Sequence, residues 1–422
     1  MPTASSVPRI SRSHARAIAL AAQGLHEPAS DVAAQLERTG FVRTVGGVDA
    51  YLAIRARVPS TTRAEIDALL AGGEARVIPA VRGCIYLVAR SHVAPALRLA
   101  ALLAEPRERR EHAKAGIEAG EIDRVAAAVL DALRDNGPST TNALRRHLPV
   151  GVVRSLGATG KKVGISSTLP PALRRLEFAG AIERANEDGR LDNERYQWRL
   201  ASHADDFAGA DETALYDAIG EVYLRAAGVA TRKGLAAWAG IKQGDAKAVL
   251  ERLPVVAVEI EAATEIDGAT DTYYLLAERE SWLDRPPEVA GSLAFVTFED
   301  NLLALHDGPA FLTESRHHHV EVPKWGRAKG STLGDITHTL ARTIVIDGAI
   351  GGFWEYDPDR QEVVTATLEP ASATVVDRLG SAAADPGAFI RDQLGHGQSF
   401  SLDTDDGLRK RVAFVESLSG KV

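Results

Sequence analysis

GFVRTVGGVDAYLAIRAR at residues 40–57 and RVIPAVRGCIYLV at residues 76–88 decide the fold of the N-terminal part of this chain. The dipeptide Gly46–Gly47 is typical of a turn. Asp49 then precedes an apolar segment with helical periodicity. The second stretch predicts two buried strands that meet near Arg82–Gly83. We therefore expect a turn, a short helix and a strand pair to pack together here.

Charged residues are unusually dense beside these apolar segments: Arg43, Asp49, Arg55, Arg57 and Arg82. Such a density of charge next to apolar strands is typical of a surface that binds an anion. Ordinary arginines on a solvated helix face would give the same sequence, so both interpretations stay open.

Length and composition indicate an ordinary globular protein of several domains. The chain has 422 residues, of which 45% are hydrophobic and 25% charged. Its single cysteine, Cys84, excludes an internal disulfide and a cysteine-based zinc site, as in proteins of a reducing cytoplasm. No apolar run approaches the ~20 residues of a membrane span, and the first residues lack the apolar core of a secretory signal. We expect a cytoplasmic monomer without a cofactor.

Positive charge is concentrated in two segments, although the net charge of the whole chain is −8. Residues 1–110 carry 15 arginines, no lysine and 9 acidic residues, a net charge of +6. Ser139–Arg184 has eight lysines and arginines against Glu177 and Glu183, again +6. Contact with DNA or RNA is favoured over chance clustering.

The predicted elements repeat as short helices followed by a strand pair, a pattern typical of winged-helix units. The first unit spans residues 8–105, with helices expected at Ile10–Gly24, Ser30–Arg38, Ser60–Leu70 and Ser91–Leu103. Ser30 and Ser91 are expected as N-caps. The charged segment Glu105–His112 is expected to be a linker.

Two further units follow, at residues 118–202 and 210–280. Three helices and a two-stranded wing are expected in each, and the wing of the third unit has an acidic tip at Ala262–Asp271. The remainder, residues 291–420, predicts strands and a β-rich domain, with a partly open barrel as one arrangement. The predicted fold class is α+β, with tandem winged-helix domains followed by this β-rich C-terminal domain.

Two basic segments are candidate phosphate contacts. In a winged-helix unit the third helix and the wing usually contact nucleic acid, and in the second unit this favours Lys161, Lys162, Arg174 and Arg175. The segment Arg316–Ser331 is basic, contains glycine and carries Trp325, as a nucleic-acid-contacting loop would. Its candidates are Arg316, His317, Lys324, Arg327 and Lys329. A solvated face and a polar loop, respectively, are the alternatives.

Evidence for other chemistry is weak. The adjacent histidines His317, His318 and His319 would not converge on a metal ion, because neighbouring side chains diverge on a helix or a strand; no metal site is expected. The pair Glu299–Asp300 fits acid–base catalysis or helix capping, and capping is favoured. Phosphate-binding glycine loops and the GxSxG and HExxH motifs are absent.

Several segments together resemble the winged-helix DNA glycosylase family typified by AlkZ and YcaQ. They are RAIALAAQGL, LAIRARVP, AVRGCIYLV, FEDNLLALHDGPAFL and RTIVIDGAIGGFWEYD. The resemblance covers most of the chain. It implies tandem winged helices and a C-terminal β domain around a DNA channel, and hydrolysis of the N-glycosidic bond of an alkylated or crosslinked base.

The sequence departs from this family at the catalytic motif. Members carry Gln-apolar-Gln or Gln-apolar-Asp where this chain has Arg43, Thr44 and Val45. Valine cannot orient a water molecule, and arginine would repel the positive charge that develops on the sugar. Asp49, four residues after Val45, is the remaining candidate for the catalytic carboxylate.

Three functions remain open. The chain is a glycosylase acting on double-stranded DNA through Asp49, a DNA-binding protein without hydrolytic activity in which Arg43 contacts phosphate, or a protein-interaction scaffold. We expect Arg43, Arg55 and Arg82 to contact DNA in the first two cases.

Overall fold

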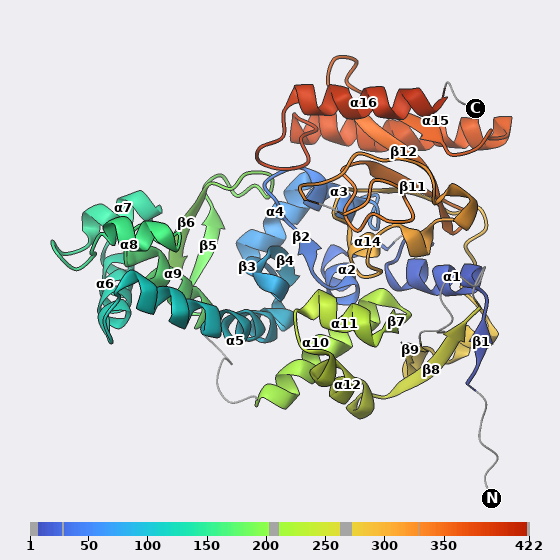
Figure 1. Cartoon of the computed structure of the whole chain (residues 1–422). Coiled ribbons are helices and arrows are strands. Elements are labelled where there is room, and N and C mark those ends of the chain that lie inside the picture. Colours follow the sequence, from blue (N-terminus) through green and yellow to red (C-terminus); the bar gives the residue numbers. More distant parts are fainter. Residues whose placement is uncertain (1–6, 28, 202–210, 262–271, 328, 420–422) are drawn as a thin grey trace, which may run out of the picture.

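The computed structural model describes residues 7–27, 29–201, 211–261, 272–327 and 329–419. Helices and sheets are mixed along the whole chain, which confirms the α+β class (Figure 1). The acidic tip expected at Ala262–Asp271 lies outside the described residues.

The first part of the chain builds helices around a three-stranded antiparallel sheet of order β2-β4-β3. Its strands are β2 (Val42–Arg43), β3 (Ala75–Pro79) and β4 (Ile85–Ala89), and its helices are α1 (Arg12–Ala22), α2 (Val32–Thr39), α3 (Asp49–Arg55), α4 (Arg63–Gly72) and α5 (Arg90–Ala115). In the register of this sheet, Arg43 lies opposite Tyr86. The expected strand pair and the helix that begins at Asp49 are both present.

The helices in this part begin and end at residues that suit capping, but two predicted N-caps and the predicted linker are wrong. Thr62 and Glu65 form a capping box at the start of α4, and Gly73 ends that helix in the left-handed conformation. Asp31, not Ser30, caps α2, and α5 begins without a side-chain cap. The expected linker at Glu105–His112 is wrong, because α5 continues to Ala115. Its glutamates and arginines favour a helix and pair along it, as Arg107 does with Glu111 at 2.6 Å.

The second part has a core made of its own residues, including Val125, Val129, Leu144, Leu173 and Trp198. Its elements are α6 (Glu121–Asn136), α7 (Thr141–His147), α8 (Gly157–Lys162), α9 (Leu169–Phe178), β5 (Ile182–Asn186) and β6 (Tyr196–Leu200). The two strands pair with each other in antiparallel fashion.

The third part forms a sheet of order β1-β8-β9-β7. Its elements are α10 (Glu212–Ala227), β7 (Ala230–Thr231), α11 (Arg232–Ala239), α12 (Gln243–Arg252), β8 (Val255–Ile260), β9 (Thr272–Leu276) and α13 (Ser281–Asp284). The strand β1 (Arg9–Ile10), from the start of the chain, pairs in parallel with β8.

The C-terminal part is an antiparallel sheet of order β10-β11-β12-β13, against which the helices α15 and α16 pack (Figure 1). Its elements are β10 (Leu293–Val296), α14 (Asn301–Ala304), β11 (Arg342–Ile346), β12 (Ala349–Asp357), β13 (Glu362–Thr367), α15 (Ala373–Phe389), a π-helical turn (Ile390–Leu394) and α16 (Asp405–Ser419). The described strands form an open sheet and not a barrel, and the two long helices correct the expectation of a predominantly β domain.

Hydrophobic cores cross the predicted domain boundaries. One core joins Phe41 and Tyr86 of the first part to Tyr223 and Trp238 of the third. Another joins Tyr51 on α3 to residues of the C-terminal part such as Trp354 and Phe389. The division into three winged-helix domains and a β-rich C-terminal domain stays a prediction. Among the described residues, the first part shares its cores with the third part and the C-terminal part. None of the described helices combines the length and the apolar character that crossing a lipid bilayer requires.

The turn at Gly46–Gly47 is covered by the C-terminal part. The Val48 amide donates to the carbonyl of Gln398 at 2.9 Å, and the Ser401 amide donates to the carbonyl of Val45 at 2.9 Å. A Cβ atom on Gly47 would lie 2.2 Å from the carbonyl carbon of Ser399. Glycine is therefore required here by close approach of two backbones.

Gly47→Ala is expected to lower the free energy of unfolding by at least roughly 2 kcal/mol, because the crossing backbone cannot move away without losing both hydrogen bonds. Urea denaturation measures the change. Gly244→Ala on α12, where a Cβ meets nothing within 4 Å, is the control and should gain between zero and about 1 kcal/mol. Equal stabilities of the two variants would contradict the proposed packing.

Candidate functional site

Arg43 occupies the family motif position at the end of β2 and is 22% exposed. Its guanidinium lies over the ring of Tyr86, 5.3 Å from the ring centre, and donates to the carbonyl of Ile85 at 3.3 Å. Its Nε is 4.0 Å from Oε2 of Glu299. Val45, the second motif position, is half-buried, and its backbone carbonyl accepts from the Ser401 amide. The motif strand therefore presents a cation beside an acidic residue of the C-terminal part.

Glu299 has a strained backbone and is only 13% exposed. Its φ of 58° lies in the left-handed region, which costs a glutamate roughly 1–2 kcal/mol. The residues on either side are fixed. Phe298 packs against Trp325 and Phe400, and Asp300 caps α14 and forms two hydrogen bonds with the buried Arg57, at 2.9 and 2.8 Å. The capping role expected for Glu299–Asp300 thus belongs to Asp300.

His338 is the direct partner of Glu299. Its Nδ1 lies 2.7 Å from Oε1 of Glu299, and its side chain is 38% exposed. This hydrogen bond raises the pKa of His338 above its usual value, although burial opposes the shift. Burial alone would raise the pKa of Glu299, but the hydrogen bond and charge of His338, with the charges of Arg43 and Arg82, hold it below its usual value. Glu299 is therefore ionised at neutral pH, and its carboxylate favours the protonated form of His338.

Exposed cations lie on the segments that carry or adjoin this pair. Arg82 is exposed, has a φ of 57°, and donates to the Tyr86 hydroxyl at 3.3 Å. Residues 321–339, called the 321–339 loop, return on themselves through bridges such as the one between Lys324 and Thr339. The amide of Trp325 donates to the carbonyl of His338 at 3.1 Å. The exposed side chains of the loop include Lys324, Arg327 and Lys329.

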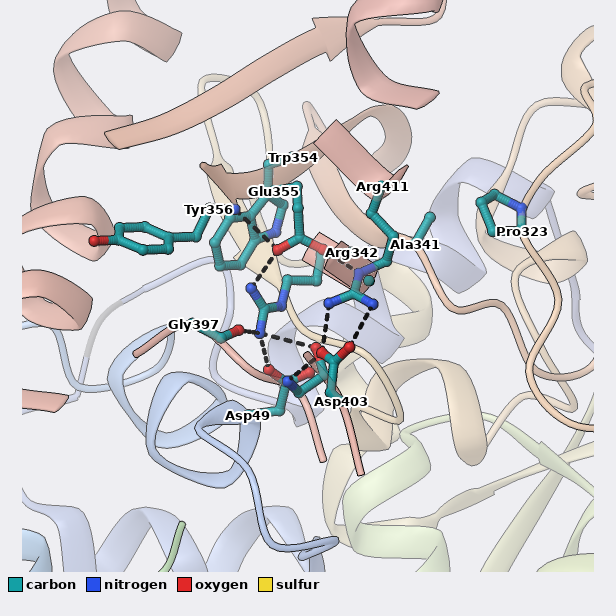
Figure 2. Close-up of polar contacts among 12 residues, drawn as sticks. Asp49, Pro323, Ala341, Arg342, Trp354, Glu355, Tyr356, Gly397, Asp403 and Arg411 are labelled. Carbon is teal, nitrogen blue, oxygen red and sulfur yellow. Dashed lines mark hydrogen bonds and ion pairs between the residues drawn. The ribbon is translucent and has the colours of Figure 1, made fainter. Parts of the chain in front are cut away.

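Asp49 belongs to a buried network of ion pairs (Figure 2). Its Oδ1 accepts from Arg342, which is fully buried and also binds Glu355 at 2.6 Å. Arg411 bridges Glu355 to Asp403, at 2.5 and 2.6 Å. The Oδ2 atom of Asp49 is buried without a hydrogen-bond partner among the described residues. Asp49 thus joins the start of α3 to the C-terminal sheet.

The charges of this network do not balance. Three carboxylates, of Asp49, Glu355 and Asp403, face the two guanidiniums of Arg342 and Arg411. Burial raises the pKa of Asp49 to about 6, and the nearby charge of Glu355 adds to this effect against the opposing effect of Arg342. A small cavity is lined by Asp49 together with Arg43, Arg57 and Glu299. The two candidate carboxylates therefore border one space with opposite pKa shifts.

Other predicted contacts lie elsewhere. Lys161 and Lys162 are exposed at the end of α8. Figure 1 shows α8 and α9 apart from α3 and α14. On α9, Arg174 and Arg175 pair with Glu108 and Asp123, at 3.1 and 2.6 Å, with more than half of each arginine side chain exposed. These four cations form a second group on the second part of the chain.

Three predicted residues have protein partners that limit contact with DNA. Arg55 binds Asp385 at 3.0 Å through Nε and lies over the ring of Phe389, which links α3 to α15. Arg316 pairs with Glu369 at 2.8 Å, and the buried His317 lies 3.3 Å from the same carboxylate. Within the described ranges, no group of three metal-binding side chains occurs.

Sequence reasoning located Arg43 and Arg82 beside each other but missed His338. A lone histidine in a loop carries no local signal. The FEDN segment did indicate its partner Glu299. Two adjacent acidic residues that follow an apolar strand cannot both cap the same helix, so one of them is left for another role.

Asp49→Asn should change how stability depends on pH. Because the folded-state pKa of Asp49 lies above its unfolded value, its contribution is fully present below about pH 4 and is lost as pH rises through about 6. The free energy of unfolding of the wild type, relative to Asp49→Asn, should fall by as much as roughly 3 kcal/mol between pH 4 and 7. Urea denaturation at several pH values measures this difference; a constant difference would contradict it.

His338 should titrate above its ordinary pKa, as measured by NMR of the imidazole resonances with His338→Gln for assignment. In Glu299→Gln its pKa should fall, because burial and the charge of Arg82 remain while the carboxylate is gone. The stabilising pair is complete below the unfolded pKa of histidine and is lost as pH rises through the folded pKa. An unchanged pKa in Glu299→Gln would show that the pair does not form in solution.

The segment that contains this site matches a known protein family. The family model described as DNA glycosylase AlkZ-like matches residues 36–389. Among solved structures, the Streptomyces sahachiroi DNA glycosylase AlkZ has a TM-score of 0.66 at 17% sequence identity, over 93% of this chain and 99% of that chain. At this identity the structural likeness shows a shared fold. A comparison with curated proteins gave no match. The match over residues 36–389, which include the motif positions Arg43 and Val45, shows that the chain belongs to the AlkZ-like DNA glycosylase family.

Proposed function

We propose that this protein binds double-stranded DNA on the face that carries the 321–339 loop and hydrolyses the N-glycosidic bond of an alkylated base. The observation that carries the proposal is the arrangement of charge. The charges of Arg43 and Arg82 act on the partly buried Glu299. The 321–339 loop, which carries the exposed Lys324, Arg327 and Lys329, also contains His338, the partner of Glu299. Cations at the rim would hold phosphates, while a carboxylate inside would favour the cationic sugar of the transition state.

The overall negative charge is compatible with this function because phosphate contacts are local. The net charge of −8 is spread over 422 residues, and the Debye length is only about 8 Å at physiological ionic strength. The second group of cations, from Lys161 to Arg175, would contact the duplex farther from the lesion.

A second function, DNA binding without hydrolysis, is favoured by one observation. Arg43 and Val45 stand where the family carries two polar residues, and the valine side chain cannot form a hydrogen bond with water. In that case the protein would recognise damaged DNA and leave the base in place. Base release from duplex DNA that contains 7-methylguanine separates the two functions.

DNA affinity should fall steeply with salt, which fluorescence anisotropy with a labelled duplex measures. Replacing Lys324, Arg327 and Lys329 together by alanine should weaken binding and reduce the salt slope by about 2 to 3, close to one per lost phosphate contact. Lys410→Ala on α16, an exposed cation on a different element, should leave the slope unchanged. Salt-independent binding, or equal slopes for both variants, would overturn the proposed DNA-binding face.

A further inference from the structure

We propose that Glu299 is the catalytic carboxylate of this protein, replacing the polar motif that the family carries at Arg43 and Val45, and that His338 positions it. The inference rests on the proposed hydrolytic function and adds the residue that performs it. It begins from the position of Glu299, which borders the same small cavity as Arg43 and lies 4.0 Å from its guanidinium.

The strained backbone indicates that the side chain at this position is needed. Glycine would adopt a φ of 58° without the cost that glutamate pays. Phe298 and Asp300 are fixed by the aromatic cluster and by Arg57, so the chain cannot relax around Glu299. Backbone strain held in place by its surroundings is concentrated at functional sites.

The partners of Glu299 keep it ionised, and its Oε2 has no hydrogen bond to the described residues. His338 binds Oε1, whereas the distance from Oε2 to Arg43 is too long for a hydrogen bond. Arg43 is instead directed to the Tyr86 ring and the Ile85 carbonyl. Arg82 and Asp307 add charges of opposite sign around His338. Oε2 is therefore the oxygen that can accept a proton from water.

The reaction balances without a further acid. In a 7-alkylguanine nucleotide the base is cationic. As the C1′–N9 bond breaks, its electron pair goes to the base, which leaves neutral. A water oxygen forms the new bond to C1′, and its proton goes to Oε2 of Glu299 and then to solvent. The carboxylate also stabilises the oxocarbenium-like transition state, as in glycoside hydrolysis.

His338 connects this chemistry to DNA binding. Its backbone carbonyl accepts from Trp325, the residue after Lys324, and its imidazole holds Glu299. Contact of the 321–339 loop with phosphate would thus fix the orientation of the histidine. This is a positioning role, because the imidazole acts through the carboxylate.

The test compares wild type, Glu299→Gln, Glu299→Asn, His338→Gln and Asp49→Asn. The control is Asp347→Asn, an exposed carboxylate in the turn between β11 and β12 that also has a left-handed backbone. Glu299→Asn guards against misfolding, because asparagine tolerates this conformation. Two quantities are measured on the full chain: single-turnover release of 7-methylguanine from duplex DNA, and affinity for duplexes with a cationic pyrrolidine or a neutral tetrahydrofuran in place of the nucleotide.

Wild type should release the base and bind the pyrrolidine duplex about tenfold or more tightly than the tetrahydrofuran duplex. Both Glu299 variants should lose release by roughly 10²- to 10³-fold and lose the preference for the cation, while affinity for the neutral duplex persists. The rate of base release should fall about tenfold in His338→Gln and should not change in Asp347→Asn.

The other outcomes separate the proposed hydrolytic function from the proposed role of Glu299. Release at the wild-type rate by the Glu299 variants would overturn the role of Glu299 and leave the glycosylase function standing. Loss of release in Asp49→Asn alone would assign the reaction to Asp49 instead. Binding of DNA by wild type without release or cation preference would overturn hydrolysis and Glu299 together and favour the non-hydrolytic function.

Discussion

The buried guanidinium of Arg342 is the interaction on which the arrangement of this protein depends. It joins Asp49, at the start of α3, to Glu355 in β12, two residues more than 300 positions apart. A buried charge costs several kcal/mol unless each of its partners is in place. The ion pair between Arg342 and Asp49 therefore forms only when the motif segment is docked against the C-terminal sheet. The same docking brings Gln398 and Ser401 over the turn at Gly47. The position of β2 relative to Glu299 follows from this constraint.

Local sequence patterns predicted many of the helices and strands, but they did not predict which distant strands pair with each other. The helix expected at Ser60–Leu70 and the strands around Arg82–Gly83 depend on neighbouring residues and were predicted from the sequence. The parallel pairing of Arg9–Ile10 with β8 joins residues 250 positions apart and left no local pattern. The segment 105–112 was mistaken for a linker because its charges indicate solvent exposure, which a helix on the surface satisfies equally well.

The candidate site shows the same division. The sequence identified Arg43, Asp49 and Arg82 from their density of charge, and left Glu299–Asp300 between two roles. The structure assigns the roles to different residues, since Asp300 caps α14 and binds Arg57 while Glu299 turns away in a left-handed conformation. A positive φ on glutamate, and its contact with His338 at a distance of 39 residues in the chain, depend on the tertiary fold and could not be predicted from composition or periodicity.

The substitution at the motif changes the charge of the site, and Glu299 restores it. Arg43 and Arg82 alone would form a cationic site, which attracts phosphate but opposes positive charge on a sugar. Glu299 places one negative charge among them, at 2.7 Å from His338 and 4.0 Å from Arg43. A neutral amide in the family motif can orient water without changing the local charge. In the proposed reaction the cation and the anion would have to act together, because the arginine alone would oppose the positive charge that develops on the sugar.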